Sequence, residues 1–119
     1  MDMKLFDSEL KVMELLWKEG ELTAGRLAAL LKEQTGWNRN TTYTIIKKLI
    51  DKGAAARSEP NFVCRPLVTR AQIQRQEAGA LIGRLFDGSV DAFLAAFLNG
   101  KTLSEAEIAR LKTLVESYQ

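Results

Sequence analysis

The sequence predicts a mainly α-helical fold that contains one small β-hairpin. Three short helical patterns fill residues 8–52, two extended stretches follow at 54–67, and helical periodicity returns from Thr69 onward. The chain has 119 residues, enough for one ordinary domain or for a small domain with a helical appendage. We therefore expect two domains, residues 1–68 and residues 69–119.

The first helical pattern covers Ser8–Lys18 and stops at Gly20. Asp7 or Ser8 is the expected N-cap, because either side chain can accept a hydrogen bond from a free backbone N–H group. The apolar stripe of this helix consists of Leu10, Met13, Leu16 and Trp17.

The next two helices carry clear start and stop signals. Thr23 is a good N-cap for the second helix, which ends near Gly36. Asn38 is the expected N-cap of the third helix. This helix ends at Lys52, and Gly53 occupies the C′ position that follows. The second helix is expected to bury Leu27, Leu30 and Leu31.

The period of the pattern changes after the third helix. Ala54–Glu59 and Phe62–Leu67 flank Pro60-Asn61, which predicts two strands joined by a short turn. The single cysteine, Cys64, lies on the second strand, cannot form an internal disulfide, and is expected to be an inert strand residue.

The charge is concentrated on the third helix and the hairpin. Residues 36–65 hold six Lys or Arg against two Asp or Glu, whereas residues 1–35 hold five against seven and residues 66–119 hold six against six. A basic block beside a neutral or acidic remainder is typical of a nucleic-acid contact. Together with three helices and a hairpin, it predicts a winged helix-turn-helix followed by an α-helical dimerisation region.

The third helix has two different faces. Thr42, Ile45, Ile46 and Leu49 lie toward one side and are expected to pack on the first two helices, while short polar side chains line the other side. Side chains of this kind can bond base edges in the major groove of DNA. The alternative is a packing role for Thr42 and Tyr43. The residues expected to read bases are Arg39, Asn40, Thr41, Tyr43, Thr44 and Lys47.

Contacts to the DNA backbone are expected from three elements: the start of the second helix, the third helix and the hairpin. Such contacts position a protein on DNA without reading its sequence. A competing interpretation is a winged-helix module whose basic face binds an acidic protein partner. The residues expected to contact phosphates are Thr23, Lys48, Arg57, Ser58 and Asn61.

The residues after Thr69 carry more apolar surface than a few short helices can bury among themselves. Helical patterns at Thr69–Phe86 and Val90–Leu98 precede a capping box, Ser104–Glu107, that opens a last helix. A second copy of the chain would cover this surface, and packing against the winged helix is the alternative. The expected dimer contacts are Ile73, Leu81, Leu85, Val90, Phe93, Leu94, Phe97, Leu98, Ile108, Leu111 and Val115.

The composition argues against membrane and catalytic proteins. No apolar run approaches the roughly 18 residues of a transmembrane helix, and Met1–Asp7 is too polar for a secretory signal. The chain has no histidine, and no paired-carboxylate, metal-ligand or glycine-rich phosphate motif is present. We therefore predict a cytoplasmic protein that is not an enzyme, has no catalytic residue, metal or cofactor, and does not insert into a membrane.

Four segments resemble the penicillinase-repressor family (BlaI/MecI/CopY), and the similarity covers nearly the whole chain. They are Ser8–Trp17 (SELKVMELLW), Trp37–Gly53 (WNRNTTYTIIKKLIDKG), Pro66–Arg70 (PLVTR) and Leu103–Ile108 (LSEAEI). The resemblance implies a homodimeric transcriptional repressor that binds an inverted-repeat operator in double-stranded DNA. In this interpretation, the winged helix binds the DNA and the C-terminal helices form the dimer.

The resemblance also implies two ways in which repression could be relieved. Members that respond to β-lactams are cleaved in the segment matching Phe93–Leu98, with a membrane metallopeptidase sensor as partner. The matching bond is Ala96–Phe97, where the family has Asn before Phe; a dimer-core role is the alternative for this segment. Copper-responsive members carry a Cys-x-Cys motif near the C-terminus, and this chain has none.

Overall fold

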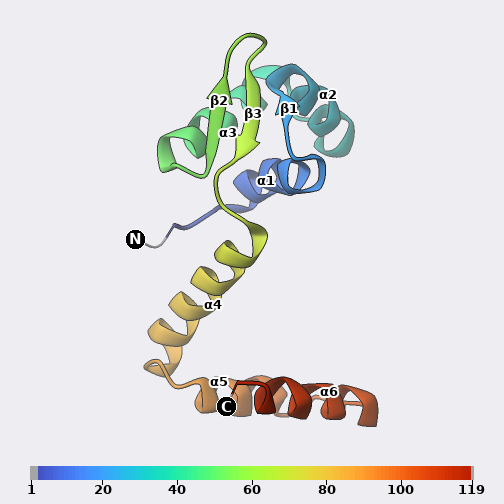
Figure 1. The fold of residues 1–119 in the computed structure, drawn as a ribbon, viewed down its shortest axis with the longest axis vertical. Coiled ribbons are helices and arrows are strands. Elements are labelled where there is room, and N and C mark those ends of the chain that lie inside the picture. The colour runs from blue at the N-terminus through green and yellow to red at the C-terminus, as the bar shows by residue number, and fades with distance from the viewer. Residues whose placement is uncertain (1–2, 119) are drawn as a thin grey trace. The chain divides into compact units, whose positions relative to one another are not determined.

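The computed structural model describes residues 3–118. Residues 1, 2 and 119, which belong to the polar N-terminus and to the end of the expected second domain, lie outside the described residues. The chain forms two compact units, Met1–Ala80 and Leu81–Gln119. Figure 1 labels the elements, which are α1 (Asp7–Glu19), β1 (Leu22–Thr23), α2 (Ala24–Thr35), α3 (Arg39–Lys52), β2 (Ala55–Ser58), β3 (Val63–Pro66), α4 (Arg70–Phe86), α5 (Val90–Leu98) and α6 (Glu105–Glu116).

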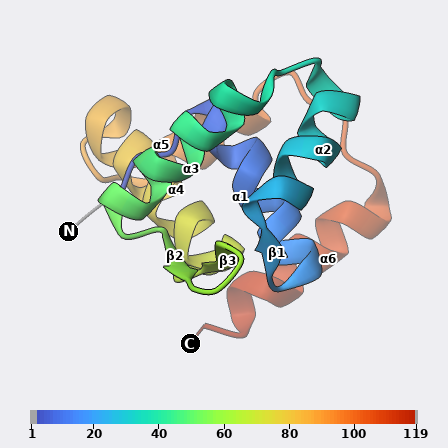
Figure 2. The same cartoon turned by 90° about the horizontal axis from the view of Figure 1, so that it is seen from above.

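The first unit is a winged helix, as the sequence predicts. In the view of Figure 2, α3, α1 and α2 lie beside one another and the strands run along one side of them. The strands form an antiparallel sheet in the order β1-β3-β2, with Ser58 opposite Val63 in the hairpin. The sequence predicts no strand between the first two helices, because two residues are too few to show alternation. Its pairing partner is the free edge of β3, where Leu22 lies opposite Cys64.

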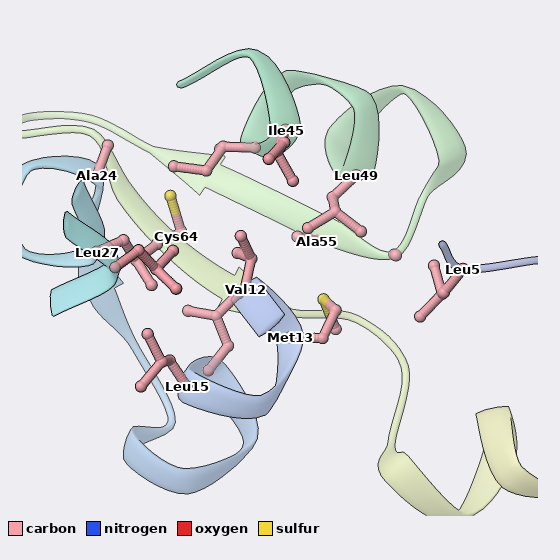
Figure 3. Packing of buried hydrophobic residues seen from close by; sticks show 14 of the residues in the cluster. Leu5, Val12, Met13, Leu15, Ala24, Leu27, Ile45, Leu49, Ala55 and Cys64 are labelled. Carbon is pink, nitrogen blue, oxygen red and sulfur yellow. The ribbon is translucent and has the colours of Figure 1, made fainter. Parts of the chain in front are cut away.

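The core of the first unit lies between α1, α2, α3 and the sheet (Figure 3). Two predicted N-caps form as expected: Thr23 Oγ1 accepts from the backbone N of Arg26 at 3.1 Å, and Asn38 Oδ1 accepts from Thr41 N at 2.8 Å. Each such cap contributes about 1 kcal/mol by satisfying a helix N–H group that has no partner in the helix. The caps therefore fix where α2 and α3 begin. The fully buried apolar side chains include Val12, Met13, Leu16, Leu27, Leu31, Ile46 and Leu49.

Helix α1 differs from the sequence prediction at its start and in its buried face. The N-cap position is Phe6, not Asp7 or Ser8, and the Phe6 backbone N–H donates to Oε1 of Glu9 at 2.8 Å. The buried face is rotated relative to the predicted stripe, so Leu10 and Trp17 are only half-buried. The buried residues of α1 are Glu9, Val12, Met13, Leu15 and Leu16.

An ion pair links the buried face of α1 to the end of α3. Lys52 Nζ lies 2.6 Å from Oε1 of Glu9 and 2.7 Å from the carbonyl oxygen of Lys4. The Glu9 side chain is 2% exposed, so its charge requires this partner. A buried carboxylate paired across 43 residues of sequence cannot be recognised from helical periodicity.

The first turns of α4 belong to the first unit, which corrects the expectation for Ile73. Ile73 is 3% exposed and packs in the same core as α1, so it is not available to a second copy of the chain. Trp17 Nε1 donates to the Val68 carbonyl oxygen at 2.8 Å, and Arg70 pairs with Glu14. These contacts hold the start of α4 against α1.

The second unit consists of the end of α4, α5 and α6. Ser89 caps α5, and Ser104 with Glu107 forms the predicted capping box of α6, each side chain accepting from the other residue's backbone N–H at 3.1 Å. Phe93 stacks with Phe97 and meets Phe86 edge-on. None of residues 81–118 is buried.

Candidate nucleic-acid interface

Helix α3 has one buried face and one exposed face, as predicted. Thr42, Ile45, Ile46 and Leu49 are buried against the first unit, and the expected base-reading residues lie outside this face. Five of them are exposed and Tyr43 is half-buried. The exposed five are Arg39, Asn40, Thr41, Thr44 and Lys47.

A groove of about 610 Å³ runs between α3 and the hairpin. It brings together four expected base-reading residues with Arg57, an expected phosphate contact. It also contains Asp51 and Phe62, which the sequence pattern does not predict at the interface. The groove is lined by Asn40, Tyr43, Thr44, Lys47, Ile50, Asp51, Arg57 and Phe62.

A second groove of about 470 Å³ lies between the start of α1 and the first turns of α3. It holds Thr41 and Lys48, which do not line the first groove. Asn40 and Thr44 line both grooves, so they lie on the ridge of α3 between them. This position gives Asn40 and Thr44 the best access to a ligand that contacts α3 along its length.

Four of the expected base-reading side chains, Arg39, Thr41, Tyr43 and Thr44, already make hydrogen bonds within α3 or to its N-cap residue. Thr44 Oγ1 donates to the Asn40 carbonyl oxygen at 2.9 Å, so its hydroxyl is left as an acceptor and its methyl group as an apolar contact. Arg39 Nη2 donates to Tyr43 Oη at 2.8 Å, with the guanidinium 4.9 Å from the ring centroid. Thr41 Oγ1 donates to Asn38 Oδ1 at 3.1 Å. These bonds hold the four side chains in defined orientations.

Lys47 and Lys48 provide positive charge on the exposed side of α3. Both side chains are exposed, and neither forms an ion pair with any residue between 3 and 118. A lysine without an acidic partner can approach a phosphate without first giving up an ion pair. The two lysines are therefore available for an anionic ligand.

The charges on the wing, residues 55–66, are partly engaged. Arg57 donates to Oε1 of Glu59 at 2.6 Å, and the hydrogen bond from Arg57 holds the pKa of the Glu59 carboxyl below its usual value. Arg65 donates to the hydroxyl of Ser58 at 3.1 Å. Asn61 is exposed at the turn, where its φ of 75° lies in the left-handed region that asparagine tolerates. Of the expected phosphate contacts, Arg57 therefore carries a charge that is already paired.

The remaining expected phosphate contact is Thr23. Its hydroxyl caps α2, and the residue is half-buried on β1. Cys64, one register position away on β3, is buried, and burial raises the pKa of its thiol to about 11. Because the Thr23 hydroxyl is engaged in the cap, a ligand would meet the start of α2 and not a free side chain. The Cys64 thiol stays protonated at neutral pH.

Sequence reasoning missed three residues of the interface: Asp51, Glu59 and Phe62. Asp51 follows Lys47 by one helical turn on the same face of α3, so its position was readable from the period of the helix. Phe62 was assigned only as the start of a strand. The sequence shows only an aromatic residue directly after the turn residues Pro60-Asn61, and this does not reveal the partners of its ring.

The second unit has a broad exposed apolar face. Apart from Ile73, the residues expected at a dimer interface are exposed or half-buried, with Phe97 54% and Val115 61% exposed. Leu114 and Tyr118, at 54% and 83% exposed, extend the same face of α6. Exposed apolar patches of this extent are typical of interaction sites.

The Ala96–Phe97 bond lies inside α5, and both residues are exposed. A protease binds its substrate as an extended strand, because the scissile carbonyl must reach the catalytic groups. Cleavage at this bond therefore requires α5 to unwind locally.

None of the helices within residues 3–118 has the length and hydropathy to cross a bilayer. In the same part of the chain, no group of three or more Cys, Asp or Glu side chains is placed to hold a metal ion.

Comparison with known proteins gives a consistent set of similarities. The model of the family described as Penicillinase repressor matches residues 5–117. The chain is 25% identical to the penicillinase repressor of Bacillus licheniformis, over 98% of this chain and 92% of that protein. It is also 25% identical to the methicillin resistance regulatory protein MecI of Staphylococcus aureus (strain N315), over 97% of this chain and 98% of that protein. The names of these relatives describe repressors and regulators, not enzymes.

Two solved structures each resemble 60% of the chain. One is the solution structure of the DNA-binding domain of the repressor BlaI, with a TM-score of 0.54 and 27% identity, covering 60% of this chain and 92% of that one. The other is the Bacillus licheniformis BlaI monomeric form in complex with the blaP half-operator. Its TM-score is 0.52 at 26% identity, covering 60% of this chain and 89% of that one.

Proposed function

Because this chain belongs to the penicillinase repressor family, we propose that it is a transcriptional repressor that binds double-stranded DNA. The observation that carries the proposal is the exposed polar face of α3 beside the groove that α3 forms with the wing. The similarity to BlaI bound to a half-operator supports it. A repressor acts where the chromosome lies, so we place this protein in the cytoplasm.

The proposed reading surface is α3, inserted into the major groove. Asn40 bonds adenine, Thr44 offers its methyl group to thymine or its oxygen to a base donor, and Lys47 bonds guanine. Arg39, Thr41 and Tyr43 complete the proposed set of base-reading residues. Each well-formed base contact discriminates against a wrong base by about 1–3 kcal/mol.

The proposed backbone contacts lie on both sides of α3. Lys48 binds phosphates on the side of α3 that faces the start of α1. Thr23, at the start of α2 beside β3, binds them on the wing side together with Arg57, Ser58 and Asn61. Such contacts release counterions, so the affinity falls steeply as the salt concentration rises.

We further propose a homodimer that binds an inverted-repeat operator, with residues 1–68 as the DNA-binding domain and residues 69–119 as the dimerisation domain. The exposed apolar side chains of α5 and α6 support the second copy as their partner. One winged helix makes few ionic contacts with DNA. When two winged helices are linked in a dimer, binding of the first raises the effective concentration of the second at its half-site. Loss of the dimer would therefore nearly abolish operator occupancy.

Relief of repression by proteolysis at Ala96–Phe97 is part of the same proposal, with a membrane metallopeptidase sensor as the protease. A cut there would divide α5 and separate α6 from the DNA-binding domain. Purified protein is incubated with such a sensor and the fragment masses are measured. A cut elsewhere, or none, would contradict this step.

The DNA-binding proposal is tested by fluorescence anisotropy with duplexes from the promoter region of the regulated gene and with scrambled duplexes. Thr44→Ala and Lys47→Ala should each weaken binding to the specific duplex about tenfold. Lys32→Ala, at the exposed end of α2, is the matched control and should bind like the wild type. Unchanged binding by both α3 variants would show that the reading face is wrongly assigned. Binding to an acidic protein in place of DNA would favour the interaction-module alternative.

A further inference from the structure

Phe62 lies where three elements of the proposed DNA-binding surface meet. Its ring meets the Tyr43 ring of α3 edge-on, with the ring centroids 5.6 Å apart. The Arg57 guanidinium of β2 lies 3.7 Å from the centroid of the same ring. The Phe62 carbonyl oxygen accepts from the backbone N of Ala24, at the start of α2, at 2.9 Å. One residue therefore contacts α2, α3 and the wing.

The backbone conformation of Phe62 is unfavourable in isolation. Its φ of 50° lies in the left-handed region, which side chains larger than that of glycine rarely adopt. The backbone N–H of Phe62 donates to Oε2 of Glu59 at 2.9 Å, which closes the turn around this conformation. Such a conformation persists where surrounding contacts hold it, and strained residues of this kind gather at functional sites.

The contacts of Phe62 extend in both directions across the surface. On one side, Tyr43 accepts a hydrogen bond from Arg39 at the first residue of α3. On the other side, Arg57 pairs with Glu59 at the end of the wing strand. The side chains Arg39, Tyr43, Phe62, Arg57 and Glu59 thus form a continuous series of contacts from α3 to the wing.

We propose that Phe62 is a positioning residue for DNA binding, which couples the wing to the recognition helix α3. The inference rests on the proposed function. Base contacts by α3 and phosphate contacts by the wing form together only if the distance between the two elements is held. The Phe62 ring supplies that link because its edge and face contact one side chain from each element.

The test compares two variants that both keep an apolar side chain at position 62. Phe62→Leu retains most of the volume but removes the ring, whereas Phe62→Tyr retains the ring and is the matched control. The probe is a duplex that the wild-type protein selects from a random-sequence pool. Dissociation constants are measured by anisotropy across a series of salt concentrations, and thermal unfolding checks that each variant folds.

The leucine variant should bind the selected duplex at least tenfold more weakly, and the tyrosine variant within about threefold of the wild type. The plot of log affinity against log salt concentration should become shallower for the leucine variant by about one, because one wing cation no longer reaches its phosphate. Amide hydrogen exchange at residues 57–62, measured without DNA, should accelerate in the leucine variant and leave α1 unchanged.

Wild-type affinity of Phe62→Leu would overturn the proposal, and so would an equal loss in both variants or a loss with an unchanged salt slope. Phe62→Met, a second side chain without a ring, repeats the test if the leucine variant does not fold. Failure of the wild-type protein to select any duplex would overturn the proposed function itself. In that case the exchange measurement still reports whether Phe62 holds the wing, which separates the two failures.

Discussion

The indole Nε1 of Trp17 donates a hydrogen bond to the carbonyl oxygen of Val68, 2.8 Å away, and thereby ties α1 to the segment that follows the wing. Arg70, two residues later, lies 5.3 Å from the centroid of the Trp17 ring and pairs with Glu14. The chain is thus held against α1 on leaving β3, and Ile73 is brought into the core. The DNA-binding unit therefore depends on residues beyond its last strand.

The first prediction concerns the length of a stable DNA-binding fragment. Residues 1–80 should unfold at a higher urea concentration than residues 1–68, because the shorter fragment loses the buried Ile73 side chain. Burial of one such side chain contributes about 2–3 kcal/mol. In a fragment of residues 1–80, Ile73→Ala should reproduce most of the loss, while Gln74→Ala, exposed on the same helix, should not. Equal stability of the two fragments would contradict the role of α4.

The second prediction concerns the buried Glu9–Lys52 pair. Lys52→Met leaves a buried carboxylate without its partner, and we expect a loss of about 3 kcal/mol in the free energy of unfolding. Lys48→Met, on the exposed side of the same helix, is the control. The double variant Glu9→Leu/Lys52→Met should regain much of the loss, since it removes both charges. Equilibrium urea unfolding measures all three variants, and a stable Lys52→Met protein would refute the account.

The third prediction concerns the charge of the wing. Glu59→Gln removes the carboxylate that pairs with Arg57, so the guanidinium becomes free to bind a phosphate. DNA affinity should rise severalfold, because Arg57 no longer gives up its ion pair on binding a phosphate, and the salt slope should change little, because the number of phosphate contacts stays the same. Glu33→Gln, exposed near the end of α2 and outside the grooves, is the control for the change in net charge. A weaker complex in Glu59→Gln would mean that the ion pair itself is needed to order the wing.

The fourth prediction concerns the apolar face of the second unit. Leu94→Asp and Leu111→Asp should shift the protein toward monomer in analytical ultracentrifugation, because each places a charge in an apolar interface. Thr113→Asp adds the same charge on the opposite side of α6 and should leave the dimer intact. A dimer that survives both Leu94→Asp and Leu111→Asp would place the interface elsewhere.

The fifth prediction follows from the buried thiol of Cys64. Burial raises its pKa from 9.0 to about 11, so the folded state binds the proton more tightly than the unfolded state. The resulting stabilisation is complete below about pH 9 and is lost as the pH rises toward 11. Between pH 8 and 10.5 the wild type should lose about 2 kcal/mol more than Cys64→Ala, measured by urea unfolding. Equal losses would mean that the thiol is not buried in the folded protein.

Local chemistry accounts for what was predictable from the sequence. Asn38, Thr23 and Ser104 have side chains that cap helices, and all three do so in the structure. The two faces of α3 were readable because buried and exposed positions recur with the helical period. Signals of this kind depend only on residues three or four positions apart.

Long-range partners account for what was not predictable. The charge of Glu9 is buried because Lys52 neutralises it, and β1 is a strand because β3 offers a free edge. The periodicity around Ile73 indicated an apolar side but could not say which surface would cover it. Phe62 contacts α2, α3 and β2 through a backbone conformation that aromatic residues seldom adopt. No local pattern encodes such an arrangement.

None of residues 81–118 is buried, and this has a consequence for how regulation depends on the amount of protein in the cell. If pairing hides these helices, the population of paired chains at low abundance grows with the square of the synthesis level. A gene controlled by the pair would then respond to a modest fall in repressor production more sharply than to the same fall in a one-chain regulator. Sensitivity to dosage would thus originate in α5 and α6, not in α3.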